Sequence, residues 1–134
     1  MMTKQQAIKT MIGLLIAVLL FHLSIITQII PFTIVWAGKI NTVDEMRIFE
    51  TISILVNLLL LILFLLKGNF IKHKISHKVL NGILWFFLVA FILNTVGNLF
   101  AKTMFERWVF TPLTLLSALL IWVIIRNKKN IENS

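Results

Sequence analysis

The sequence predicts an all-α integral membrane protein, a single domain of four transmembrane helices packed as an antiparallel bundle. Hydrophobic residues make up 59% of the 134 residues and charged residues only 13%, whereas a soluble domain carries about a quarter charged residues. A soluble domain of this length leaves much of its surface exposed, so it could not bury this much apolar surface. Four apolar stretches are also each close to the roughly 20 residues that a helix needs to cross a membrane. We therefore expect lipid to surround this chain.

The four predicted spans belong to one domain, residues 1–134. In chain order they are residues 10–30, 48–66, 79–100 and 109–125. Helices are expected because a helix satisfies every backbone N–H and C=O within the spanning segment, and the alternating pattern of a barrel strand is absent. The first span follows two lysines, as a signal peptide core does, but it is too long and lacks a nearby small-x-small cleavage site. We interpret it as a retained membrane anchor.

Local signals mark where the first two spans end and begin. Pro31 ends or kinks the first helix. The segment Thr33–Trp36 is β-branched and aromatic, which is typical of a short strand or an interfacial loop. Thr42 with Glu45 three residues later forms a capping-box pattern, so the second helix is predicted to start near Val43.

Basic residues are concentrated on one side of the four predicted spans. Nine of the thirteen lie in the N-terminal segment, the middle loop and the C-terminal tail: Lys4, Lys9, Lys67, Lys72, Lys74, Lys78, Arg126, Lys128 and Lys129. The other side carries four basic residues, offset by four acidic ones. Cytoplasmic loops carry the excess of lysine and arginine, so both termini are predicted to be cytoplasmic, in a cytoplasmic (plasma) membrane. The basic middle loop attracts anionic headgroups, which makes membrane lipids expected partners.

Polar side chains within the spans gather toward the outer half of the membrane. Glu50, Ser53 and Asn57 recur at i, i+3 and i+7, which places them on one face of the second helix. Asn94 and Asn98 share a face of the third helix. The inner segments at residues 11–21, 58–66, 82–91 and 118–125 contain no charged, amide or hydroxyl side chain. An outward-facing polar pocket over an apolar floor is therefore predicted. Its candidate ligand-binding residues are His22, Gln28, Glu50, Asn57, Asn94 and Asn98, with Trp36 as a possible lid.

Each of these polar residues also has a structural interpretation. Ser, Thr and Asn often hold membrane helices together through hydrogen bonds of about 0.6 kcal/mol on average. That interpretation is favoured for Ser53, Thr111, Thr114 and Ser117. Glu50 either pairs with Arg47 at the interface or turns inward, where it is suited to proton exchange. His22 lies near mid-membrane and needs both a donor and an acceptor partner.

No metal, haem or other cofactor is expected. The chain has no cysteine, which excludes thiol catalysis and Cys-based metal sites. His73 and His77 have a helical metal-binding spacing, but the lysines around them would repel a cation. One histidine within the spans cannot supply the paired axial ligands of a membrane cytochrome haem. Nucleic acid is not an expected partner either, because no soluble basic domain is present to carry it.

Three stretches of the chain carry recognisable motifs. They are Trp36-x-Gly38 in "IPFTIVWAGKI", Met46-x-x-Phe49-Glu50 in "EMRIFETISILVN" and Leu93-Asn94-Thr95-x-Gly97-Asn98 in "FILNTVGNLFAKTMFE". In these motifs and their order the chain resembles an uncharacterised group of small bacterial four-helix integral membrane proteins. The resemblance covers most of the chain. It implies four helices in a bacterial inner membrane and no particular activity.

The predicted function is the binding of a small or lipid-like ligand, or of a partner protein, through the outward-facing pocket. One alternative is a structural or accessory subunit of a membrane complex, whose polar clusters only pack helices. Another is a membrane-embedded enzyme that uses His22 and Glu50 as acid and base, which requires both groups to face one cavity. Transport needs a route through the apolar inner halves or along an oligomer interface. The sequence assigns no catalytic residue, ligand identity or oligomeric state.

Overall fold

All regular structure in the described part of the chain is helical. The computed structural model describes residues 3–34, 41–101 and 103–126. Its elements are α1 (Lys4–Ile26), η1 (Phe32–Ile34), α2 (Val43–Lys67), α3 (His77–Leu99), η3 (Glu106–Phe110) and α4 (Thr111–Arg126). Among the described residues, four helical segments are long and apolar enough to cross a membrane: α1, α2, α3, and η3 together with α4. An all-helical fold with four candidate spans is therefore confirmed.

Side-chain caps fix where the helices begin. The Thr42 hydroxyl accepts a hydrogen bond of 3.1 Å from the Glu45 amide, so α2 starts at Val43 as predicted. The Glu45 carboxylate reaches back to the Asn41 amide at 3.4 Å, one residue before the cap. Ser76 caps α3 in the same way, by accepting from the Val79 amide. Such caps satisfy amides that have no partner inside the helix.

The first helix lies closer to the N-terminus than the predicted span of residues 10–30. It begins at Lys4 and ends at Ile26. Thr27 caps the helix end, and its amide still donates to the Leu23 carbonyl at 3.1 Å. Gln28 then adopts φ 66°, a left-handed conformation that commonly terminates a helix. The helix therefore stops before Pro31 is reached.

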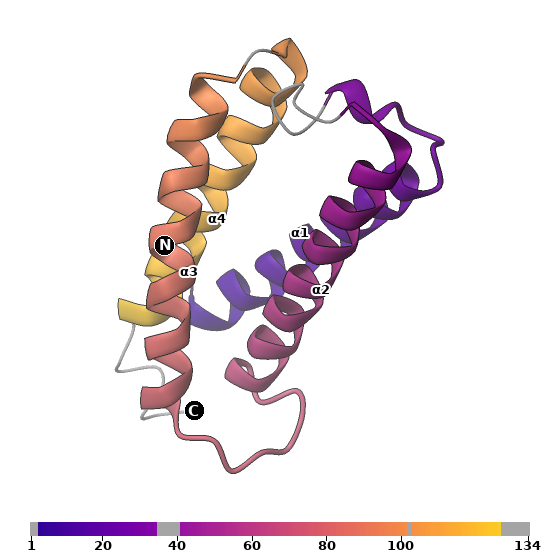
Figure 1. The fold of residues 1–134 in the computed structure, drawn as a ribbon. Coiled ribbons are helices and arrows are strands. Elements are labelled where there is room, and N and C mark those ends of the chain that lie inside the picture. Colours follow the sequence, from indigo (N-terminus) through magenta and orange to yellow (C-terminus); the bar gives the residue numbers. More distant parts are fainter. Residues whose placement is uncertain (1–2, 35–40, 102, 127–134) are drawn as a thin grey trace.

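The four helices form two hairpins, α1 with α2 and α3 with α4 (Figure 1). Each hairpin packs extensively within itself. The hairpins are joined mainly by α1 against α4, whereas α2 and α3 contact each other little. Figure 1 shows them closest where α1 begins and α4 ends.

We call that end of the bundle the packed half and the other end the cavity half. The packed half is a continuous core from all four helices: Ala7, Ile8, Met11, Leu15, Leu60, Leu63, Phe64, Leu80, Leu84, Phe87, Leu88, Ala118, Leu120, Ile121, Ile124 and Ile125. Except for Ala7, Ile8 and Leu80, these residues lie within the inner segments that carry no charged, amide or hydroxyl side chain. Two lysines at its edge, Lys4 and Lys67, are also buried.

The fourth span begins with a π-helical turn. Residues Glu106–Phe110 form η3, which continues directly into α4, so this span is longer than the predicted residues 109–125. A π turn widens the helix locally and changes which side chains face inward, and such turns are frequent at functional sites. Here it leaves Glu106 buried.

Candidate functional site

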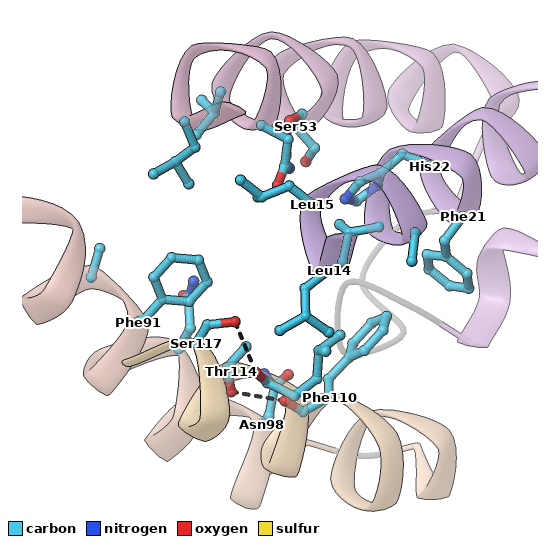
Figure 2. A pocket seen from close by; sticks show the side chains of 18 of the residues that line it. Leu14, Leu15, Phe21, His22, Ser53, Phe91, Asn98, Phe110, Thr114 and Ser117 are labelled. Atoms are coloured by element: carbon cyan, nitrogen blue, oxygen red, sulfur yellow. Dashed lines mark hydrogen bonds between the residues drawn. The ribbon is translucent and has the colours of Figure 1, made fainter. Parts of the chain in front are cut away.

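A cavity of about 670 Å³ lies between the two hairpins and is lined by all four helices (Figure 2). The core of the packed half forms its floor, since Met11, Leu15 and Leu60 belong to both. Five of the seven candidate residues line this cavity: His22, Glu50, Asn57, Asn94 and Asn98. The sequence pattern thus brings residues from three helices to one place.

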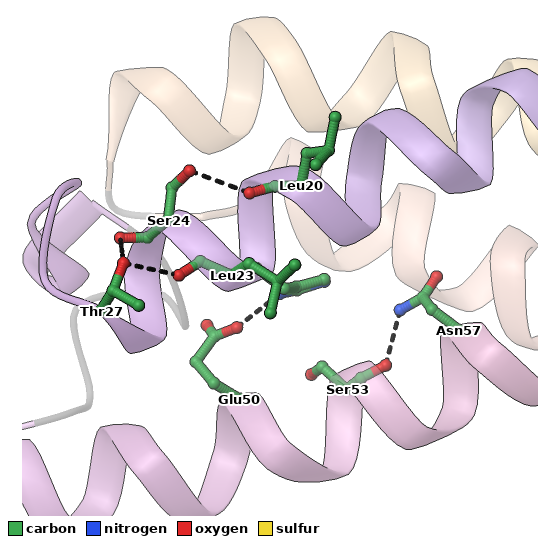
Figure 3. A network of polar contacts seen from close by, with 8 residues as sticks. Leu20, Leu23, Ser24, Thr27, Glu50, Ser53 and Asn57 are labelled. Carbon is green, nitrogen blue, oxygen red and sulfur yellow. Dashed lines mark hydrogen bonds and ion pairs between the residues drawn. The ribbon is translucent and has the colours of Figure 1, made fainter.

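His22 and Glu50 form the most buried polar contact of the cavity. Glu50 Oε2 lies 2.5 Å from His22 Nδ1 and the carboxylate side chain is fully buried, while the imidazole is 16% exposed. Glu50 points from α2 toward α1 (Figure 3), and Arg47 is exposed. A buried carboxylate needs a partner, and the ring nitrogen of His22 is one such partner.

Glu106 is a cavity residue that the sequence analysis missed. It lines the cavity from η3 on the second hairpin and is 5% exposed. Thr103 Oγ1 donates to Glu106 Oε1 at 2.9 Å and accepts from the Glu106 amide at 3.2 Å. This is the Thr-x-x-Glu signature of a helix start, so the sequence did contain a signal. By charge alone, Glu106 is one of the four acidic residues on the less basic side of the predicted spans.

Apart from these ionisable groups and six amide or hydroxyl side chains, the cavity wall is apolar; the six are Ser53, Asn57, Asn94, Asn98, Thr114 and Ser117. Leucine, valine and phenylalanine side chains from both hairpins surround it (Figure 2). At one end Phe21 of α1 stacks on Phe105 with ring centroids 5.7 Å apart, and it meets Phe110 edge-on at 5.3 Å. This aromatic cluster joins α1 to the start of the fourth span.

The amide and hydroxyl side chains divide between the cavity and helix packing. Asn57 lines the cavity and donates to the Ser53 carbonyl at 2.7 Å (Figure 3). Asn94 is exposed and Asn98 half-buried within the same cavity. Thr95 is different, because it is buried and its hydroxyl donates to Thr114 of α4 at 2.9 Å. Thr95 therefore packs helices, as hydroxyls commonly do in membranes.

Gln28 and Trp36 are the two candidate ligand-binding residues that are not among the described residues of the cavity lining. Gln28 is exposed in the turn after α1 and is not among the residues that line the cavity. Trp36 lies outside the described residues, so its role as a lid stays a prediction.

The histidines of the middle loop are engaged within the chain. His73 Nε2 lies 2.7 Å from the Leu66 carbonyl oxygen, and His77 Nδ1 lies 3.3 Å from Lys67 Nζ. Across residues 3–34, 41–101 and 103–126, no three His, Asp or Glu side chains come together as a metal site requires.

Comparisons of the chain with protein-family models, with curated proteins and with solved structures give no match. The resemblance to a group of small bacterial membrane proteins therefore stays a prediction. The proposed function therefore rests on the geometry of the cavity.

Proposed function

We propose that this chain is a multi-pass protein of a bacterial cytoplasmic membrane that binds one amphipathic ligand in the cavity between its hairpins. The single observation that carries the proposal is the cavity itself, an apolar space bordered by a few convergent polar groups. Its volume of about 670 Å³ falls within the roughly 300–1,000 Å³ range of small-molecule sites. Membership of the resembling bacterial group is part of the proposal, and two of its motifs supply the cavity residues Glu50, Asn94 and Asn98.

The ligand reaches the cavity sideways, from the membrane, between α2 and α3. These two helices contact each other little. On the α2 side, Ile52 and Val56 line the cavity and are still 53% and 41% exposed. An apolar opening of this kind favours a molecule with a hydrocarbon part over a fully polar solute.

A labelling experiment tests ligand binding. The purified protein, in lipid nanodiscs, is exposed to a photoreactive long-chain alcohol, and labelled peptides are mapped. Ala90→Phe fills the cavity, because Ala90 lines it. Its matched control is Val89→Phe, the neighbouring residue, which is 52% exposed and not part of the lining.

We expect A90F to reduce cavity labelling about tenfold or more, since a ring occupies the space the ligand needs. V89F should label like the unmodified protein. Equal labelling of both variants would overturn the proposal. Such a result, together with co-purification of a larger complex, would favour the accessory-subunit function instead.

The proposed orientation places both termini in the cytoplasm and the cavity half toward the outer leaflet. It rests on the excess of basic residues in the N-terminal segment, middle loop and tail. Reporter fusions in the loop at residues 67–78 and after the tail test it. A tail reporter that is active only outside the cytoplasm would contradict the orientation.

A second function, acid–base catalysis on a bound ligand, is favoured by the 2.5 Å contact between His22 and Glu50. Both groups line one cavity, which is the requirement for their cooperation. Lipid extract incubated with the reconstituted protein, followed by mass spectrometry, tests it. Conversion of a lipid that His22→Gln and Glu50→Gln both abolish, while labelling persists, would establish catalysis. Unchanged lipid profiles would leave binding as the function.

A further inference from the structure

We infer that the floor of the cavity limits the length of the ligand's hydrocarbon chain, so that the ligand is a single-chain amphiphile with a tail of about a dozen carbon atoms. This inference rests on the proposed function, ligand binding in the cavity. Polar groups lie at one end of the lining, and buried side chains close the other end.

The lining changes in character along each of the four spans. It passes from an ionisable or amide side chain in the cavity half to a buried residue at the floor. The polar residues are His22, Glu50, Asn98 and Glu106, and the floor residues are Met11, Leu60, Phe87 and Ser117. A polar head without hydrogen-bonding groups around it is costly, so the head belongs in the cavity half and the tail points toward the floor.

Two polar side chains lie closer to the floor, and each bonds to its own helix. The Ser117 hydroxyl donates to the Leu113 carbonyl at 2.9 Å, and the Asn57 amide donates to the Ser53 carbonyl at 2.7 Å. Around them the lower lining is hydrocarbon, from Leu14, Leu15, Leu60 and Phe87. This part of the cavity therefore suits an alkyl chain.

The floor is closed because its apolar residues also belong to the core of the packed half. Met11, Leu15, Leu60 and Phe87 are buried members of that core. The lateral opening does not reach the floor on α2, since its exposed residue Val56 lies one helical turn before Leu60. A tail that extends beyond the floor must displace packed side chains.

The depth of the lining gives the length of the tail. Eleven residues separate Met11 from His22 on α1, and eleven separate Phe87 from Asn98 on α3. At about 1.5 Å per helical residue this depth is about 16 Å. An extended chain advances about 1.2 Å per bond, so about 13 bonds fit between the polar end and the floor.

The membrane itself makes this limit measurable. Lipid tails are as apolar as leucine, so a methylene group gains little when it moves from the bilayer into the cavity. A methylene group that does not fit must overpack the floor, which weakens binding about tenfold or more. At equal mole fraction in the lipid, binding should be constant up to the limiting length and fall beyond it.

Competition among straight-chain alcohols tests the inference, because their heads are identical. The protein in phosphatidylcholine nanodiscs is labelled with photoreactive octanol in the presence of octanol, dodecanol, hexadecanol or eicosanol, each expressed as mole fraction in the lipid. We expect octanol and dodecanol to compete about equally. Hexadecanol and eicosanol should require about tenfold more.

Variants assign the limit to the floor by moving it in opposite directions. Leu60→Ala removes bulk from the floor and should let hexadecanol compete as well as dodecanol. Its matched control is Leu59→Ala, the same change at the neighbouring residue, which is 51% exposed and not part of the lining. Ser117→Leu adds bulk and should weaken dodecanol about tenfold while octanol still competes.

Labelling by photoreactive octanol shows that each variant keeps a folded cavity. If L60A does not label, S117L decides the question through the opposite shift. Equal competition by all four alcohols would mean that the tail leaves through the lateral opening, and the length limit would be overturned while ligand binding stands. A limit that neither variant moves would overturn the role of the floor. If octanol does not label the unmodified protein, ligand binding itself fails.

Discussion

The packed half and the cavity half are built from the same four apolar helices, yet one is closed and the other holds a cavity of about 670 Å³. In the packed half, side chains such as Phe64, Leu84 and Ile121 are completely buried against other helices. In the cavity half, polar side chains also face inward: Glu50 contacts His22, and Asn57 donates to the Ser53 carbonyl of its own helix. Apolar composition alone does not distinguish the packed half from the cavity half. The position of the polar side chains marks where the hairpins separate.

The largest expected effect comes from opening the packed half. Phe64→Ala should lower the free energy of unfolding by about 3 kcal/mol, because it leaves a void among four helices. Phe64 is 0% exposed, whereas Phe86 on α3 is 69% exposed. Phe86→Ala is the matched control, and we expect a loss of less than about 1 kcal/mol because its ring lies on the outer surface and its removal leaves no internal void. Thermal or SDS unfolding in micelles measures both, and equal losses would contradict a packed core here.

A smaller effect is expected from the polar contact of the cavity half. A double-mutant cycle with His22→Ala and Glu50→Ala should give a coupling energy of about 1.5 kcal/mol, as for a hydrogen bond to a charged group. The contact is 2.5 Å long and links α1 to α2. The same cycle with exposed Asp44 in place of Glu50 should give no coupling. Additive losses for the His22–Glu50 pair would contradict a direct bond.

Removing the buried ammonium group of Lys67 from the packed half should stabilise the protein. Lys67 is fully buried next to His77 and is repelled by Lys4. The acidic side chains of the described residues all lie elsewhere, at the start of α2 and in η3. Lys67→Met should therefore raise the free energy of unfolding by about 1 kcal/mol, because it removes an uncompensated buried ammonium. Exposed Lys72→Met is the control, and a loss of stability in K67M alone would show that an anion neutralises Lys67.

The smallest expected effect is within the second hairpin. Thr95→Val removes the 2.9 Å bond to Thr114 while keeping the shape of the side chain. We expect a loss of about 0.6 kcal/mol, the average for such bonds in membranes. Thr95→Ser keeps the hydroxyl and should retain most of the stability. A loss well above that value would mean that the Thr95–Thr114 bond also holds α3 and α4 in register.

Features that depend on a single helix were predictable from the sequence. The start of α2 at Val43 followed from the Thr42 cap, and the shared face of Glu50 and Asn57 followed from helical periodicity. These signals are local, so no knowledge of neighbouring helices is needed to use them.

Features that depend on how helices rotate against one another were not predictable. The direct contact of His22 with Glu50 requires a particular facing of α1 and α2, which periodicity does not specify. The burial of Lys67 was missed because lysines at span ends usually extend to the interface. The burial of Glu106 was missed because the Thr103-x-x-Glu106 pattern marks a helix start but does not specify which way that helix faces.

The sparse contact between α2 and α3 has a consequence for how the chain could be made. Each hairpin is self-packed, and α1 against α4 is the main junction between them. The connecting segment therefore contributes mainly proximity, that is, a high effective concentration of one hairpin near the other. A break between Lys74 and Ile75 would leave His73 with its Leu66 partner and the whole of α3 intact. Two co-expressed fragments should then reassemble into a four-helix bundle with the same cavity, which co-purification of the fragments would show.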